Sequence, residues 1–272
     1  MTNGALPVPP AGFRVIVLTC SDLGWETASE LLGMEGISVV AVVSAPLRTP
    51  ALTARLRRLR KRYGTAGMLL ELSAKLVSRL AAFGEPPLEQ PRRLRPQGVQ
   101  ELRFADLHGE DCLTAIRQLQ VDLAIVDGTY ILKPDLFSIP RLGAVNLHCG
   151  KLPEFRGSPP AFWELMNGEN EVGVSVHKVT ERLDDGPIYN EARVALDLAP
   201  PGDPMRFVHT YWMNTLRGVG RQLIAKTVRE IAEGRAVASP QRPFAGSPNR
   251  SPDAAAVREV RRRVALRRAE RG

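Results

Sequence analysis

Apolar residues recur along the first half of the chain in short, nearly continuous runs. Four of these runs, FRVIVLT, ISVVAVVS, VDLAIVD and GAVNLH, occupy residues 13–19, 37–44, 121–127 and 143–148. Strands that are buried on both faces have such runs, whereas strands with one wet face alternate between apolar and polar residues. Because helix-like stretches separate the runs, we expect an α/β fold in which a mainly parallel sheet is flanked by helices.

Helical patterns lie between these strands. The first, SDLGWETASELLG at 21–33, begins with two candidates for the N-cap, Ser21 and Asp22. A second helix is expected at 109–120, and a short one after Lys133. Strand, helix and strand in this order open a parallel sheet.

Residues 51–83 also have a helical pattern, which is basic on one side and apolar on the other. A Pro-rich stretch, GEPPLEQPRRLRPQG at 84–98, follows them, and the core pattern resumes only after it. We therefore expect a helical hairpin inserted into the sheet domain at about 51–100.

The second half of the chain has a different pattern. A helix of about two turns should end at Gly168, and GVSVHKVT and GPIYNEARVAL, at 173–180 and 186–196, should form strands. Residues 201–234 are typical of one long amphipathic helix with a kink near Gly218. A Pro/Ser-rich extended segment and a helical extension follow.

These patterns divide the chain into four parts. We expect a flexible N-terminus at 1–12, a catalytic domain at 13–200, a C-terminal helix packed on it at 201–236, and a Pro-rich, basic tail at 237–272.

The composition, with 44% hydrophobic and 24% charged residues in 272, is that of an ordinary soluble globular protein. The formal charge of +8 comes largely from residues 55–62 and 258–271. Such runs are usually solvated helix faces or tails, but they would also attract a phosphorylated or nucleic-acid-linked substrate.

Three widely spaced cysteines, Cys20, Cys112 and Cys149, include no CxxC pair, which indicates neither a disulfide framework nor a structural zinc site. The start of the chain lacks the basic and apolar regions of a signal peptide, and no run is long enough for a membrane span. We expect a cytoplasmic protein without a membrane partner.

Candidate chemistry begins at Asn146 and His148, which are two residues apart at the end of a predicted strand. Residues at this spacing project from the same face of a strand. In open α/β sheets, ligands bind beyond the carboxyl ends of the strands, which is where this pair lies. The best third polar group is in TERLDDGPI, where Asp184 and Asp185 precede a glycine.

An amide, an imidazole and a carboxylate have a joint use in acyl transfer to an amine. The amide and a protonated imidazole stabilise the oxyanion of a tetrahedral intermediate, and the carboxylate orients the imidazole and helps to remove a proton. Cys149 is poorly placed for a Cys-His pair, because adjacent residues on a strand face opposite ways. The turn TCSDLGWE after the first strand has a single glycine, which disfavours nicotinamide, flavin and ATP cofactors.

Asn146 and His148, taken with four segments that follow them, resemble the folate-dependent formyltransferase family. The segments are LPEFRG, NGE, GVSVH and LDDGPI, at 152–157, 167–169, 173–177 and 183–188. The resemblance covers roughly residues 120–195 and implies a Rossmann-like sheet. The typical family stretch is Asn-x-His-Pro-Ser-Leu-Leu-Pro, whereas this chain has Cys149, Gly150 and Lys151 after its histidine.

The resemblance implies a role for each matching residue. Asn146 would donate to the formyl oxygen, His148 would be the catalytic imidazole, and Asp184 would be their acid-base partner. The donor would be N10-formyltetrahydrofolate, used without a metal. It would be bound by the loop that holds Tyr130, Ile131 and Leu132 and by the loop that holds Leu183 and Asp185, largely through backbone groups.

Two residues are candidates for acceptor binding. Arg156 would hold an acidic group of the substrate or fix its own loop, and Trp163 would form a platform for the substrate or pack its helix. The other histidines, His108, His177 and His209, fit a helix start, a strand core and a helix face, and we assign them no role.

The resemblance includes methionyl-tRNA, glycinamide ribonucleotide and sugar-amine enzymes. Fewer than forty residues follow Gly234, which favours a small-molecule amine over tRNA, and the first turn lacks the Gly-rich phosphate loop of the glycinamide ribonucleotide enzymes. We therefore expect an amino sugar, free or nucleotide-linked, as the acceptor. Methionyl-tRNA and an amino-acid-derived metabolite are the alternatives. The resemblance is compatible with a homodimer and does not favour a nucleic-acid partner.

Two hypotheses from another class remain. The arginine-rich tail would suit a nucleic-acid-binding protein on the same scaffold, whose affinity would fall steeply with salt. The altered turn after His148 would suit a catalytically impaired folate-binding protein, in which no formyl transfer depends on His148.

Overall fold

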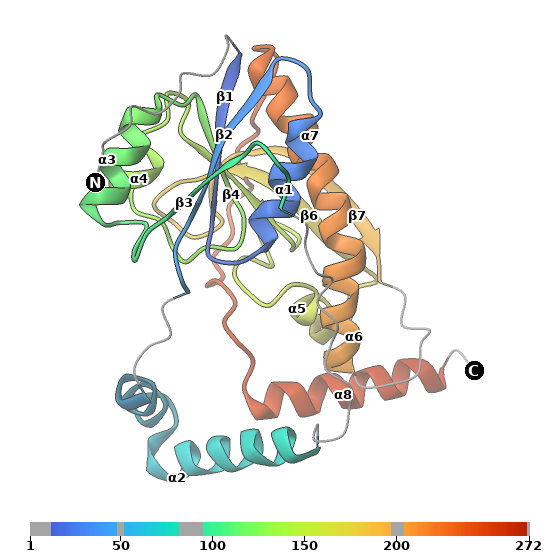
Figure 1. Cartoon of the computed structure of the whole chain (residues 1–272). Helices are drawn as coiled ribbons and strands as arrows, with labels where there is room; N and C mark the ends of the chain where they lie inside the picture. Colours follow the sequence, from blue (N-terminus) through green and yellow to red (C-terminus); the bar gives the residue numbers. More distant parts are fainter. Residues whose placement is uncertain (1–11, 48–51, 82–94, 197–203, 271–272) are drawn as a thin grey trace.

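A seven-stranded sheet forms the centre of the protein (Figure 1) in a computed structural model that describes residues 12–47, 52–81, 95–196 and 204–270. The strand order is β3-β2-β1-β4-β5-β6-β7; the first five strands are parallel, and β6 and β7 are antiparallel to their neighbours. The strands are β1 (Phe13–Thr19), β2 (Ile37–Ser44), β3 (Gln100–Arg103), β4 (Leu123–Val126), β5 (Ala144–His148), β6 (Glu171–Lys178) and β7 (Ile188–Ala195).

The buried strands divide their side chains between two cores. Val15 and Val17 of β1 pack on one face of the sheet, and Ile16 and Leu18 pack on the other. The first face is covered by α1 (Leu23–Leu32) and α7 (Arg217–Ala232), and the second by α3 (Glu110–Leu119) and α4 (Pro134–Phe137). Apolar runs without alternation are therefore what this position in the fold requires.

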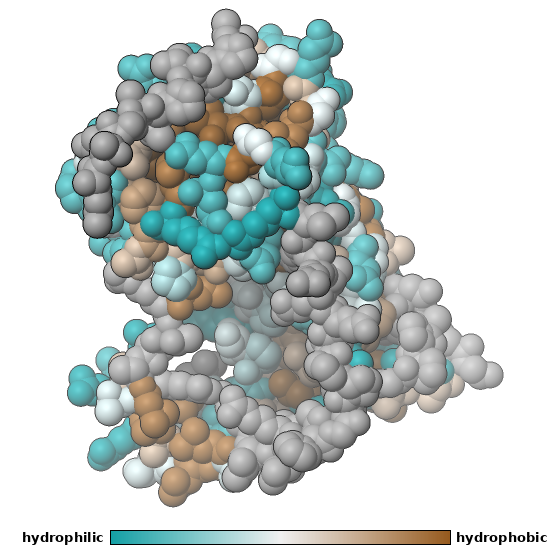
Figure 2. All heavy atoms as spheres, in the orientation of Figure 1, coloured by the Kyte–Doolittle hydropathy of each residue, from teal (hydrophilic) through white to brown (hydrophobic). Residues whose placement is uncertain are grey.

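The insertion forms α2 (Leu52–Ala81), which lies away from the sheet, at the bottom of Figure 1. Gly64 has φ 70° and ψ −176°, so the helix is broken there into two parts. Leu52, Leu69 and Leu70 are more than half exposed, and Figure 2 shows apolar surface gathered on this part of the molecule.

The C-terminal part begins with α6 (Pro204–Tyr211), continues through a π-helical turn, η1 (Trp212–Leu216), and enters α7. The sequence predicted a kink near Gly218; the structure has a π-helical turn slightly earlier, at Trp212–Leu216, and Gly218 lies within α7. An extended segment then leads to α8 (Ala254–Ala269), where the Asp253 side chain caps the helix by accepting from Ala256 N at 2.9 Å. α8 packs on α5 (Phe162–Asn167), α6 and α2.

The predicted α/β fold, with its helical insertion and C-terminal helical extension, is confirmed. The prediction missed β3, a short edge strand of sequence QELR without a buried side chain. Asp22 occupies the N-cap position of α1, but its side chain makes no capping bond; instead, the Ser21 hydroxyl accepts from Leu23 N at 3.3 Å.

Several expectations cannot be compared with the fold. The N-terminus at 1–11 and most of the Pro-rich loop at 84–98 lie outside the described residues. The boundaries of the four expected parts stay predictions. Within the described ranges, none of the helices has both the length and the apolar character that a bilayer span needs.

Candidate active site

A cleft of about 1410 Å³ opens at the carboxyl ends of β1, β4 and β5. Its lining comes from loops after these strands and from more distant parts of the chain, α6, η1 and the segment before α8. The position is the one that open α/β sheets use for ligands. The polar lining residues most relevant to chemistry are Asp127, Asn146, His148, His177, Asp184 and Arg217.

Asn146 and His148 project together from the end of β5, and Asp184 reaches them from the turn between β6 and β7. The amide Nδ2 of Asn146 donates to Asp184 Oδ1 at 3.4 Å, and His148 Nδ1 lies 3.4 Å from Asp184 Oδ2. His148 and Asp184 are both buried to more than nine tenths. The structure thus brings the three predicted catalytic residues together.

Both ring nitrogens of His148 face oxygen acceptors. Nε2 lies 2.8 Å from the carbonyl oxygen of Phe155, opposite the Asp184 carboxylate at Nδ1. A protonated imidazole would donate to both acceptors, whereas a neutral one donates to only one of them. Gly150 allows the Phe155 contact, because a Cβ at this position would collide with both His148 Nε2 and the Phe155 oxygen. Gly150, in the altered turn after His148, therefore leaves room for the Phe155 carbonyl beside the ring.

Asp184 is held as an anion in a strained backbone conformation. Its φ of 51° lies in the left-handed region, and its Oδ2 accepts from Gly157 N at 2.8 Å. Burial by itself raises the pKa of the carboxyl group, but the charges of His148 and His177 and the bond from Gly157 outweigh burial and lower the pKa to about 2. The carboxylate is ionised at every physiological pH.

His177 joins this cluster, although the sequence pattern offered no reason to assign it a role. It lies opposite Asn146 in the antiparallel register of β5 and β6. Its Nδ1 is 2.9 Å from Lys178 O, and its Nε2 is 3.1 Å from Asn146 Nδ2 and 3.5 Å from Asp184 Oδ1. When neutral, Nε2 accepts from Asn146; when protonated, it donates to Asp184. The register of these two strands was the signal that would have found it.

A second polar cluster lies deeper in the cleft around Arg217. Its guanidinium donates to both oxygens of Asp127 at 2.8 Å, and Thr27 donates to the same carboxylate at 2.6 Å. Arg217 also contacts Glu26 Oε2 at 3.2 Å. This ion pair connects the start of α7 to α1 and to the end of β4.

Cys149 follows His148 but packs into the core below α1 and α7. Burial is the main reason why the pKa of its thiol rises to about 12, although the charge of Arg217 opposes this effect. The thiol is therefore protonated and a poor nucleophile at neutral pH.

Four of the residues proposed to bind the donor line the cleft: Tyr130, Ile131, Leu132 and Leu183. Leu132 is buried, whereas Ile131 is 64% exposed. The Tyr130 hydroxyl donates to Asp106 Oδ1 and accepts from Leu107 N, both at 2.6 Å, so it fixes its own loop.

Asp185, Arg156 and Trp163 lie outside the lining of this cleft. Arg156 donates to Asp185 Oδ1 at 2.6 Å and to Gly246 O at 2.8 Å, so both charges are used within the protein. The Trp163 indole donates to Arg250 O at 3.1 Å, and its ring packs edge-on against Phe162. Asp185, Arg156 and Trp163 thus make contacts within the protein, and their roles toward the donor and the acceptor stay predictions.

The cleft suits an organic ligand. Apolar side chains of Val126, Leu132 and Leu147 lie beside a few convergent polar groups, which is typical of cofactor and substrate sites. In the described part of the chain, no group of three or more His, Cys, Asp or Glu side chains is arranged to hold a metal ion.

These features define a class of protein. The sequence model of the formyl transferase family matches residues 62–199, and the chain belongs to this family. Among curated proteins, the methionyl-tRNA formyltransferase of Parabacteroides distasonis is 28% identical over 231 residues, which cover 85% of this chain and 60% of that protein. The corresponding enzyme of Phenylobacterium zucineum is 30% identical over 194 residues, or 65% and 61% of the two chains. The chain thus spans about 60% of the length of these relatives.

Solved structures share the fold. A glycinamide ribonucleotide transformylase of Symbiobacterium toebii matches with a TM-score of 0.54 and 20% identity over 84% of this chain and 91% of that chain. A sugar N-formyltransferase of a Shewanella species matches with a TM-score of 0.51 and 13% identity over 87% and 75%.

Proposed function

We propose that the protein transfers a formyl group from N10-formyltetrahydrofolate to a primary amine, with Asn146, His148 and Asp184 as the catalytic residues. The observation that carries the proposal is the convergence of these three side chains, from β5 and the turn after β6, in the large cleft of a formyl transferase family member. The bound donor supplies a formyl group on nitrogen; the acceptor nitrogen forms a bond to the formyl carbon, the bond to the donor nitrogen breaks, and one proton passes from the amine to the donor.

The chain contributes three actions to this exchange. Asn146 donates an amide N–H to the formyl oxygen, where negative charge develops. His148, whose Nε2 faces the carbonyl oxygen of Phe155 in this structure, donates from Nε2 to the formyl oxygen during the reaction. Asp184 orients the imidazole through Nδ1, and it receives the amine proton during transfer.

The size of the cleft supports two bound molecules. Sites for one small ligand commonly measure about 300–1,000 Å³, whereas this cleft has about 1410 Å³. The donor is expected along Tyr130, Ile131, Leu132 and Leu183, as the family resemblance implies. The acceptor then takes the part of the cleft lined by α6, η1 and residues 249–251.

An anionic acceptor is supported by three exposed cations in the cleft lining, Lys133, Arg182 and Arg250. A nucleotide-linked amino sugar has this charge and remains the first candidate, in keeping with the fold shared with a sugar N-formyltransferase. Methionyl-tRNA is the second candidate, favoured by the relatives that are methionyl-tRNA formyltransferases. A homodimer and a cytoplasmic location stay predictions.

The test is a tetrahydrofolate-release assay with the donor and a panel of amines: nucleotide-linked amino sugars, free amino sugars, amino acids and methionyl-tRNA. Release that depends on one amine and is lost in His148→Ala identifies the reaction and the acceptor. Release without an amine indicates hydrolysis. Tight donor binding without release supports a folate-binding protein, and salt-sensitive RNA binding without release supports a nucleic-acid-binding protein.

A further inference from the structure

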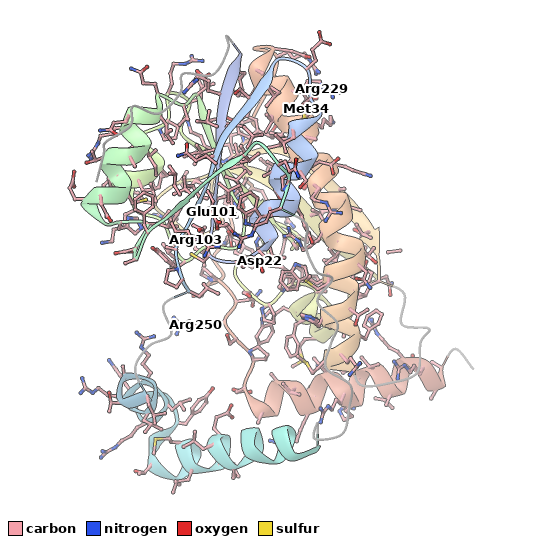
Figure 3. The ribbon with its side chains drawn as sticks, in the orientation of Figure 1. Asp22, Met34, Glu101, Arg103, Arg229 and Arg250 are labelled. Carbon is pink, nitrogen blue, oxygen red and sulfur yellow. The ribbon has the colours of Figure 1, made fainter. Side chains whose placement is uncertain are left out.

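The segment between α7 and α8, residues 237–253, runs across the catalytic turn as an extended strap. In Figure 1 it descends from the sheet to α8. Its residues 249–251 line the cleft, and Figure 3 labels Arg250 between the sheet and α2. The strap is the first part of the predicted Pro-rich tail, but its contacts place it beside the active site.

Main-chain bonds fix the strap at both ends. Near its start, Ser239 and Ile188 exchange two hydrogen bonds of 2.8 Å. Near its end, Asn249 N donates to Arg156 O at 2.7 Å, and Asn249 bridges to Gly157. Gly157 has φ 89°, and a Cβ there would collide with the main-chain oxygen of Asn249. Position 157 therefore requires a glycine. The strap contacts the chain at this residue, and the N–H of the same residue binds Asp184.

The closest connection to the catalytic residues is Gln241. Its side-chain amide nitrogen, Nε2, donates to Asp184 O at 2.9 Å and to Gly186 O at 2.8 Å. Both hydrogens of the amide are thus used to hold the two carbonyls that flank Asp185. Only the NH₂ end of the amide can donate to two carbonyl oxygens, so Nε2 and not Oε1 must face Asp184 and Gly186.

The turn that Gln241 holds is a strained one. A non-glycine residue in the left-handed region, such as Asp184, persists only when its surroundings determine its conformation. The side chain of Asp184 contacts His148 at 3.4 Å and Gly157 N at 2.8 Å. Relaxation of this backbone would move the carboxylate away from both partners.

We propose that Gln241 is a positioning residue for the reaction: it locks the Asp184 turn through its two carbonyls and so keeps the carboxylate on His148. The proposal rests on the proposed function of Asp184, but the clamp itself is independent of any acceptor. Gln241 lies in the second cavity beside Arg156, outside the lining of the catalytic cleft, and acts through the backbone.

Two variants of the full chain test the clamp. Gln241→Met keeps the length of the side chain and removes both donors, and Gln241→Glu replaces the donors with a carboxylate that faces two carbonyl oxygens. Arg242→Ala is the matched control, because it removes a neighbouring strap contact, the ion pair with Glu154, without touching the Asp184 turn. We expect kcat to fall about 10-fold to 100-fold in both Gln241 variants, as for a misplaced catalytic group. The KM for each substrate should change by less than about threefold, because the clamp does not touch the bound substrates.

The second readout needs no acceptor. In protein labelled with ¹³C at aspartate carboxyl carbons, the Asp184 signal is assigned by its loss in Asp184→Asn and titrated from acid to neutral pH. We expect the pKa of Asp184 to rise toward its ordinary value in both Gln241 variants and to stay depressed in Arg242→Ala.

The proposal is overturned if the Gln241 variants titrate and react like the wild type, if Arg242→Ala has the same effect, or if both Gln241 variants fail to fold. If the wild type transfers no formyl group to any amine, the proposed function fails, and the carboxyl titration still decides whether Gln241 holds Asp184.

Discussion

The cleft contains two polar clusters, and they are built from similar groups in different ways. Around Arg217, side-chain contacts to Asp127 measure 2.6–2.8 Å, and the arginine is only 2% exposed. Around Asp184, side-chain contacts to Asn146, His148 and His177 measure 3.4–3.5 Å. The first cluster is a bidentate ion pair with short, strong hydrogen bonds. The second cluster has longer and weaker contacts, which a substrate can replace.

The difference indicates a division of work. Arg217 and Asp127 satisfy one another and hold α7 on the sheet, so a change there should affect stability. Asn146 and His148 can donate to a ligand, and the Asp184 carboxylate can accept from one, so a change there should affect reaction rate. Substitutions in and around the two clusters can separate these roles.

Arg217→Met should destabilise the fold by about 3–5 kcal/mol, because it leaves the Asp127 carboxylate buried without its partner. Urea unfolding measures the loss. The matched control is Arg221→Ala on the same helix, which breaks a partly exposed ion pair with Glu26 and should cost no more than about 1 kcal/mol. Equal losses of unfolding free energy in the two variants would show that the pair of Arg217 and Asp127 contributes no more to stability than the partly exposed pair.

Asn146→Ala should lower kcat about 100-fold to 1,000-fold, the usual cost of one donor to a developing oxyanion. Its unfolding midpoint should remain close to that of the wild type. Asn167→Ala, at the exposed end of α5, serves as the control and should keep wild-type kinetics. A stable Asn146→Ala variant with unchanged kcat would contradict the assignment.

Glu164→Gln should change how stability depends on pH. Burial is the main cause that raises the pKa of Glu164 from 4.5 to about 7, despite the hydrogen bond from Lys151 N. A raised pKa in the folded state gives a stabilisation that is complete below pH 4.5 and lost as the pH rises through about 7.

At a pH well above 7, the wild type should have lost roughly 3 kcal/mol of unfolding free energy relative to acid pH. The variant should not show this loss, because its glutamine side chain stays neutral. Unfolding free energies measured from acid to mildly alkaline pH make the comparison. Parallel curves for the two proteins would contradict the buried, protonated state of Glu164.

His177→Ala should lower kcat about 10-fold to 100-fold, because the Asn146 amide and the Asp184 carboxylate lose the side chain that contacts both of them and fixes their positions. His177→Gln offers a carbonyl oxygen to the same amide and should recover part of the rate. Steady-state kinetics of the two variants measure the effect, and an alanine variant as fast as the glutamine variant would show that His177 has no positioning role.

The local features were predictable from the sequence. Apolar runs identified β1, β2, β4 and β5, because buried parallel strands need such runs on both faces. The spacing of Asn146 and His148 and the LDDG step pointed to a common site, and the structure brings these residues together.

Features that depend on distant contacts were not predictable. β3 is a polar edge strand and has no apolar pattern. His177 acquires its partners through strand register, and Gln241 reaches Asp184 over 57 positions of sequence. The Arg156 side chain is of a type that binds anions, but in the folded protein it forms an ion pair with Asp185.

The two adjacent aspartates provide the most direct test. Transfer of a ¹³C-labelled formyl group to the acceptor found in the amine panel should be compared in Asp184→Asn and Asp185→Asn. The first should lose about 100-fold to 10,000-fold in rate, as expected for an acid-base group, and the second should stay within about tenfold of the wild type, since a fixing contact contributes less. A slow Asp185→Asn beside a fast Asp184→Asn would contradict the account.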